Sequence, residues 1–232
     1  MNKENAWLVA AAMLVAGPAF AQQSPMPADI AAKLLELGRV IDPPKTSALY
    51  IPLHEKEPYA GVKIERDVKY GAAERNLLDV FMPEANSAAR PVLIFVHGGG
   101  FVRGDKAPPG SPFNDNVMVW AARSGMVGVN INYRLAPKDP WPAGSQDTAA
   151  AIAWVRAHIA EHGGDPDRVF IWGHSAGANH VADYISHDEF HPKGTGLAGA
   201  DMTELGAVLK GQAEDLTARG RPVDGPLSDL FE

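Results

Sequence analysis

Residues 173–177 (Gly-His-Ser-Ala-Gly) combine a nucleophilic side chain with the backbone freedom that nucleophilic catalysis needs. They follow the apolar run Val169–Trp172 and precede a helical pattern from Ala178 to His187. Between a strand and a helix, G-x-S-x-G forms a tight turn that presents the serine hydroxyl at the helix N-terminus, where developing negative charge is favoured. The pattern predicts Ser175 as a nucleophile. The alternative is a glycine-rich turn that has this spacing by chance.

A second glycine-rich stretch, residues 97–101 (His-Gly-Gly-Gly-Phe), follows another apolar run. Glycines let neighbouring backbone N–H groups turn toward one point, as an oxyanion hole requires. We expect the amides of Gly98, Gly99 and Ala176 to form this hole, and His97 to orient the loop rather than to act as a base.

A phosphate-binding loop is the alternative interpretation of the same glycines. Such a loop needs a lysine shortly after the glycines and a helix that opens directly on them. Lys106 is close, but residues 108–110 (Pro-Pro-Gly) prevent a helix from starting there. The oxyanion loop is therefore the better interpretation.

Four motifs occur in an order that resembles the hormone-sensitive-lipase-like carboxylesterases of the α/β-hydrolase superfamily. They are residues 97–100, residues 132–137 (Asn-Tyr-Arg-Leu-Ala-Pro), Asp147 at a helix start, and residues 173–177. The resemblance covers about Val62 to His187. It implies an α/β-hydrolase fold, with helices on both faces of a mostly parallel sheet.

The same resemblance implies a chemistry. Ser175 would attack the carbonyl of a small-molecule ester, Gly98, Gly99 and Ala176 would hold the oxyanion, and no cofactor or metal would be needed. Tyr133, Arg134 and Asp147 would brace the sheet edge beneath the site. An amidase or formamidase would use the same acyl-transfer machinery.

The rest of the catalytic triad does not follow the family's pattern. A serine hydroxyl needs a histidine to take its proton and an acid to orient that histidine. In this fold both residues follow the serine along the chain, the acid before the histidine. The last histidine is His191, so only His187 and His191 are available. Their acid would be Asp183, Asp188 or Glu189.

The position of His187 argues against a triad. It lies a dozen residues along the helix that starts at Ser175, which places it roughly 18 Å away. We therefore expect a fold that is incomplete at its C-terminal end, either a truncated esterase or a catalytically silent relative that only binds ligand. A metal site at residues 187–191 (His-x3-His) is a further alternative, but we interpret these residues, together with His158 and His162, as surface.

Hydrophobic periodicity predicts the elements that must position these residues. Alternation predicts two antiparallel strands at 62–70 and 78–82, and unbroken apolar runs predict buried strands at 91–96, 126–131 and 169–172. Helices are expected at 28–38, 113–124 and 145–162, and a turn at 165–167. This alternating order predicts right-handed crossovers in a mostly parallel sheet.

The last part of the chain fits the fold less well, because the family needs three more strands after the one that precedes Ser175. Residues 197–200 could begin one of them, but the apolar run stops at Asp201. From Asp201 to Gly220 the pattern is that of an amphipathic helix.

Composition excludes several other functions. The net charge of −7 and the lack of a basic run argue against binding to nucleic acid. The chain has no cysteine, which excludes disulfides, thiolate catalysis and cysteine-ligated zinc.

The N-terminus predicts export. Lys3 precedes an apolar run, residues 6–17, and the small-x-small triplet 19–21 (Ala-Phe-Ala) follows. This is the order of a secretory signal that is cleaved after Ala21, so a secreted or periplasmic protein is expected. A membrane anchor is the alternative, but the run is shorter than the roughly 20 residues of a spanning helix, so no stable membrane insertion is expected. The sequence thus divides into a signal peptide (1–21), a cap-like segment (22–60) and a partial α/β-hydrolase domain (61–232).

Overall fold

The computed structural model describes residues 26–40, 42–85 and 89–203. It divides into two compact units, Met1–Tyr50 and Ile51–Glu232. The predicted signal peptide lies outside the described residues, and its boundary and that of the cap-like segment stay predictions. In the described part of the chain, no helix is long and apolar enough to cross a membrane.

The first unit contains two helices, α1 (Ala28–Leu37) and α2 (Pro43–Tyr50). The first agrees with the helix expected at 28–38. The second was missed, because two consecutive prolines read as a helix breaker. They occupy the first two positions of α2, where a missing N–H costs no helical hydrogen bond.

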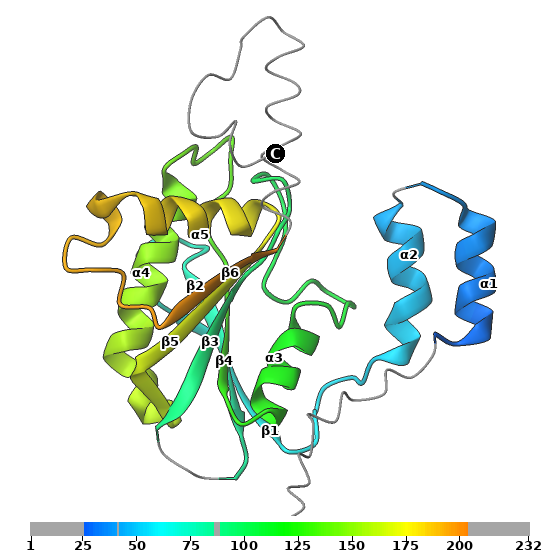
Figure 1. The fold of residues 1–232 in the computed structure, drawn as a ribbon, viewed down its shortest axis with the longest axis horizontal. Coiled ribbons are helices and arrows are strands. Elements are labelled where there is room, and N and C mark those ends of the chain that lie inside the picture. Colours follow the sequence, from blue (N-terminus) through cyan, green and yellow to red (C-terminus); the bar gives the residue numbers. More distant parts are fainter. Residues whose placement is uncertain (1–25, 41, 86–88, 204–232) are drawn as a thin grey trace, which may run out of the picture. The chain divides into compact units, whose positions relative to one another are not determined.

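The second unit is built on a six-stranded sheet with the order β1-β2-β4-β3-β5-β6 (Figure 1). β1 pairs antiparallel with β2 and β2 antiparallel with β4, whereas β3 is parallel to β4 and β5, and β5 is parallel to β6. The six strands are Val62–Lys69, Leu77–Pro83, Arg90–Val96, Val127–Ile131, Gly164–His174 and Gly199–Thr203. The predicted antiparallel pair and the mostly parallel remainder are both present.

Helices cover both faces of this sheet. They are α3 (Asp115–Arg123) on one face, and α4 (Ala143–His158) and α5 (Ala176–Ser186) on the other (Figure 1). Short 3-10 turns occupy Ile51–Leu53, Ile159–His162 and Asp188–Phe190. The layers are those of an α/β-hydrolase fold, as expected.

Alternate residues of β3 explain why this strand is apolar throughout. Val92, Ile94 and Val96 are fully buried in the core beneath α4 and α5. Phe95, which points the other way, belongs to the core beneath α3. A strand covered on both faces needs no polar side, so an unbroken apolar run is its correct signature.

Two predictions near the ends of β5 and β6 need correction. Residues 165–167, where a turn was expected, lie inside β5. The pairing of β5 with β3 shifts register at these residues, between the pairs Arg90↔Gly164 and Val92↔Val169. Asp201 lies in β6, not at a helix N-terminus, and pairs with Trp172. One of the three further strands that the family needs is thus present. The rest of the predicted amphipathic helix lies outside the described residues.

Candidate active site

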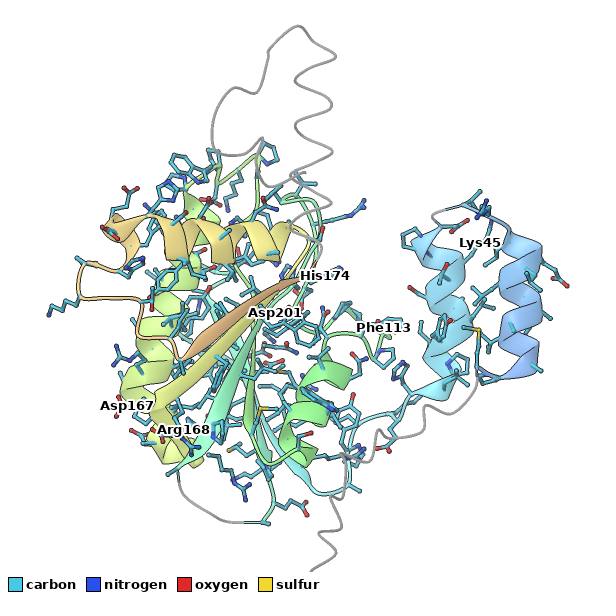
Figure 2. The ribbon with its side chains drawn as sticks, in the orientation of Figure 1. Lys45, Phe113, Asp167, Arg168, His174 and Asp201 are labelled. Atoms are coloured by element: carbon cyan, nitrogen blue, oxygen red, sulfur yellow. The ribbon has the colours of Figure 1, made fainter. Side chains whose placement is uncertain are left out.

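Ser175 connects β5 to α5. It lies at the carboxyl edge of the sheet, directly after His174, the last residue of β5 (Figure 2). Its backbone has φ 53° and ψ −119°, a conformation that residues with a side chain rarely adopt. Such strain collects at functional sites because the surrounding structure must hold it in place. The tight turn expected at 173–177 is present.

The two glycines of this turn allow the close packing around it. A Cβ on Gly177 would lie 2.1 Å from the carbonyl oxygen of Val96, and one on Gly173 would lie 2.6 Å from the Cα of Ala178. Both contacts are with backbone, which cannot move aside as a flexible side chain can. These positions therefore require glycine.

The loop after β3 packs directly on the turn. A Cβ on Gly98 would lie 3.0 Å from the Cβ of Ser175, and Gly99 has a φ of 139° that favours glycine. Among the hydrogen bonds of the described residues, none uses the amide of Gly98 or Gly99 as its donor. Ala176 is the first residue of α5, at the positive end of the helix dipole. Gly98 and Ala176, two of the three residues predicted for an oxyanion hole, thus lie next to Ser175, and Gly99 follows Gly98 in the loop; the hole itself stays a prediction.

All eight histidines of the sequence fall within the described residues. The two that the triad order allows are held at the far end of α5. His187 Nδ1 lies 3.1 Å from the carbonyl oxygen of Asp183, and His191 Nε2 lies 3.1 Å from that of Ile185. Neither is brought to Ser175, as the length of the helix predicts.

The three candidate acids are also placed elsewhere. Asp183 accepts hydrogen bonds from Ser145 Oγ at 2.8 Å and from Trp141 Nε1 at 3.0 Å. Asp188 and Glu189 are exposed in the 3-10 turn that follows α5. No acid–histidine pair from the predicted set therefore reaches the serine.

His158 and His162 lie before β5, at the opposite edge of the sheet, and both rings pack near Trp154. His158 is exposed, as expected. The surface prediction is wrong for His162, whose side chain is only 14% exposed and lies 3.6 Å from Glu65. Across the described residues, no group of three or more His, Cys, Asp or Glu side chains is arranged to hold a metal ion.

His97 is buried beneath the glycine loop and orients it. Its Nδ1 donates to the carbonyl oxygen of Gly98 at 2.6 Å, because a carbonyl can only accept. Its ring stacks on Tyr133 at 4.5 Å, and the Tyr133 hydroxyl donates to the His97 carbonyl at 2.8 Å. Burial lowers the pKa of His97 to about 4, so the ring is neutral near pH 7.

His180 is a buried residue that no motif indicated. It lies on α5, where its ring contacts Phe101 and Tyr133 edge-on and its Nδ1 lies 3.3 Å from Ser145 Oγ. Burial also lowers the pKa of His180 to about 4. The sequence offered one signal, since His180 falls on the buried stripe of α5 with Val181 and Tyr184.

Arg134 and Asp147 brace the sheet edge in the way that the resemblance implies. The guanidinium of Arg134 binds the buried carboxylate of Asp147 through Nη2 at 2.8 Å and Nε at 3.0 Å, and its backbone amide donates to the same carboxylate at 2.7 Å. These bonds tie the loop after β4 to the start of α4.

A cavity of about 390 Å³ adjoins the turn. Asn179, in its lining, donates through Nδ2 to the carbonyl oxygen of Ser175 at 3.2 Å. The other lining residues are Phe101, Arg134, Ala136, Asp139, Pro140, Trp141, Gly144, His180 and Asp183. Aromatic and aliphatic walls with a few polar groups are typical of small-molecule sites.

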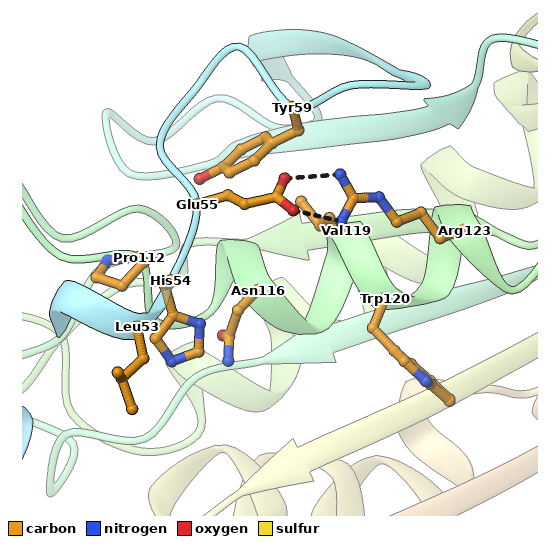
Figure 3. A pocket seen from close by; sticks show the side chains of 9 residues that line it. All are labelled: Leu53, His54, Glu55, Tyr59, Pro112, Asn116, Val119, Trp120 and Arg123. Atoms are coloured by element: carbon orange, nitrogen blue, oxygen red, sulfur yellow. Dashed lines mark hydrogen bonds and ion pairs between the residues drawn. The ribbon is translucent and has the colours of Figure 1, made fainter. Parts of the chain in front are cut away.

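A second cavity, of about 300 Å³, lies between α3 and the segment before β1 (Figure 3). Arg123 and Glu55 form a bidentate ion pair on its wall, with Nη2 2.7 Å from Oε2 and Nη1 3.1 Å from Oε1. It includes no residue of the serine turn or of the glycine loop. It therefore carries no argument for the hydrolytic site.

Comparison with protein families and with curated proteins points to esterases. Residues 78–190 match the BD-FAE family model. The chain is 42% identical over 119 residues to Esterase LipQ and 39% identical over 120 residues to Carboxylesterase NlhH, both of Mycobacterium tuberculosis. Each match covers 50% of this chain, but only 27% and 35% of those proteins. The chain thus spans about a third or less of the length of these curated relatives.

Solved structures give the same fold. Brefeldin A esterase, described as a bacterial homologue of human hormone sensitive lipase, superposes with a TM-score of 0.57 at 20% identity, over 82% of this chain and 52% of that one. A bacterial heroin esterase superposes with a TM-score of 0.52 at 29% identity, over 71% and 53%. Both similarities support the fold described above.

Proposed function

We propose that this chain, which has the α/β-hydrolase fold, is a carboxylic-ester hydrolase with Ser175 as its nucleophile. One observation carries the proposal: the strained backbone of Ser175 lies against the glycine loop, with the Gly98 backbone next to its Cβ. A nucleophile beside preorganised amides is the arrangement that acyl transfer needs.

The reaction would run in two stages. Ser175 Oγ forms a bond to the ester carbonyl carbon, loses its proton, and the carbonyl oxygen becomes an oxyanion that accepts hydrogen bonds from the amides of Gly98, Gly99 and Ala176. The tetrahedral intermediate then expels the alcohol, which takes up a proton, and leaves an acyl group on Ser175. Water adds to this second ester, and the carboxylic acid departs as the serine regains its proton.

We place part of the substrate in the cavity that adjoins the turn, because Asn179 connects its wall to the Ser175 backbone. The substrate would be a small-molecule ester. The second candidate function is that of a relative that binds such ligands without turnover, and it is favoured by the placement of His187 and His191 at the far end of α5.

A fluorophosphonate probe tests the proposal. We expect it to label Ser175 selectively but slowly, because the turn presents the hydroxyl while His187 and His191 are held at the far end of α5. Ser175→Ala should abolish labelling, whereas Ser186→Ala should leave it unchanged, and the fully buried Ser145 should stay unlabelled. Labelling that survives Ser175→Ala, or that is equal at Ser186, would contradict the proposal.

A further inference from the structure

Arg75 lies in the turn between β1 and β2, outside every sequence motif. Its guanidinium donates to two backbone carbonyls that are distant in sequence. Nη2 donates to the carbonyl oxygen of Gly104 at 2.9 Å, and Nε donates to that of Tyr133 at 2.8 Å. Nη1 also lies 3.7 Å from the carboxylate of Asp105.

The first of these carbonyls belongs to a residue that supports the glycine loop from behind. Gly104 has a φ of 108°, and a Cβ on it would lie 2.3 Å from the carbonyl oxygen of Gly98 and 2.6 Å from Nδ1 of His97. The backbone of Gly104 is therefore in direct contact with the His97–Gly98 segment. Its position decides where that segment can lie.

The second carbonyl belongs to a residue that supports the same segment from another direction. The hydroxyl of the fully buried Tyr133 donates to the carbonyl oxygen of His97 at 2.8 Å, and the two rings are stacked. Arg75 thus holds two of the residues that contact the His97–Gly98 segment.

We propose that Arg75 is a positioning residue for the oxyanion hole, acting through Gly104 and Tyr133 on the peptide groups of Gly98 and Gly99. This inference rests on the proposed function. The planar guanidinium fixes the angle between two carbonyls, which the single charged head of a lysine cannot do. A displacement of about 1 Å at such a site costs on the order of 100-fold in rate.

Phosphonylated Ser175 gives a readout that needs no turnover, because its phosphoryl oxygen occupies the oxyanion hole. We would measure the rate of labelling and the ³¹P resonance of the adduct for the full chain and for Arg75→Met and Arg75→Lys. Arg90→Met is the matched control, since Arg90 also donates to two backbone carbonyls, those of Ala85 and Gly125, at the opposite edge of the sheet. Circular dichroism of each variant checks that it is folded.

Arg75→Met should slow labelling by about 10- to 100-fold and move the ³¹P resonance toward that of the denatured adduct. Arg75→Lys, which keeps one donor group, should recover part of the labelling rate and part of the ³¹P shift. Arg90→Met should change neither the rate nor the resonance. Identical resonances in all folded variants would overturn the role of Arg75 and leave the proposed function intact. Absence of label at Ser175 in the unmodified chain would overturn both. If Arg75→Met does not fold, equal behaviour of Arg75→Lys and the unmodified chain overturns the inference.

Discussion

Ser175 has a backbone conformation that costs a residue with a side chain of order 1–3 kcal/mol. Its neighbours offset this cost by packing tightly on both sides, with Gly173 against α5 and Gly177 against the end of β3. The strained turn therefore depends on the absence of two side chains as much as on the presence of the hydroxyl.

Gly177→Ala tests this dependence. The added Cβ would lie 2.1 Å from the Val96 carbonyl oxygen, so the turn and β3 must separate, and overpacking of this kind costs about 1–3 kcal/mol. We expect probe labelling of Ser175 to fall at least about tenfold, since the Gly98 segment moves with β3. Gly110→Ala is the control for backbone strain alone, because Gly110 has a φ of 71° and a Cβ there meets no atom within 4 Å. Equal labelling in both variants would show that the turn tolerates the contact.

The buried histidines make stability depend on pH. The pKa of His180 is about 4 in the folded protein, against 6.5 when unperturbed, because burial disfavours the charged ring. The unfolded chain therefore binds a proton at a higher pH than the folded one. The stability contributed by neutral His180 is fully present above pH 6.5 and is lost as pH falls through 4.

Between pH 7 and about pH 4.5, the free energy of unfolding should fall by about 3 kcal/mol less in His180→Gln than in the unmodified chain. Urea unfolding at a series of pH values measures this difference. His158→Gln, at an exposed ring, is the control. Parallel profiles for His180→Gln and the unmodified chain would contradict the burial argument.

At the scale of elements, an ion-pair network joins β1, β2 and the loop after the glycines. The Lys106 ammonium, 5% exposed, lies 2.7 Å from the carboxylates of both Asp67 and Asp79. Arg66 binds Asp79 from the other side at 2.8 Å and also pairs with Asp115 at the start of α3. Asp79 is completely buried, so its charge depends on these partners.

Lys106→Met should destabilise the fold by about 3 kcal/mol, because it leaves the buried Asp79 with one cationic partner in place of two. Arg123→Met removes an exposed pair with Glu55, and we expect it to cost much less. Chemical denaturation of both variants gives the comparison. Equal losses of unfolding free energy in Lys106→Met and Arg123→Met would show that the buried network stabilises the fold no more than the exposed ion pair does.

Most strands of the sheet could be predicted because each has a local hydrophobic pattern, either alternation or an unbroken apolar run. β6 could not, since its residues (Gly-Ala-Asp-Met-Thr) have no clear pattern, and pairing with β5 makes them a strand. α2 was hidden by its two prolines. The serine turn and the glycine loop are local motifs and were predicted. Arg75 was not, because its two carbonyl partners lie 29 and 58 residues away and backbone acceptors leave no signature in sequence.

At the scale of the whole molecule, we propose export through residues 1–21, on the order of charged, apolar and small residues at the N-terminus. Expression with fractionation, followed by intact-mass analysis, should give a periplasmic or secreted protein that begins at Gln22. Ala21→Leu, which replaces a small residue at the cleavage site, should block processing. A cytoplasmic protein that retains Met1 would contradict the proposal.

The positions of six histidines bear on the activity expected of this chain. His97 and His180 are buried and neutral, His187 and His191 bind carbonyls at the far end of α5, and His158 and His162 lie at the opposite edge of the sheet. None of these six rings is hydrogen-bonded to Ser175 in the described part of the chain. In subtilisin, loss of the catalytic histidine costs about 10⁶ in turnover, while the oxyanion hole and binding preserve roughly 10³–10⁴ over water.

Hydrolysis of p-nitrophenyl butyrate by the purified 232-residue chain and by its Ser175→Ala variant tests the account most directly. We expect a rate that depends on Ser175 but is about 10⁶-fold below the 1–10³ per second of typical enzymes. A rate unchanged by Ser175→Ala would contradict Ser175 as the nucleophile. A Ser175-dependent turnover of about ten per second or more, within the typical range, would contradict this account, because it would require a base to take the proton of the serine hydroxyl.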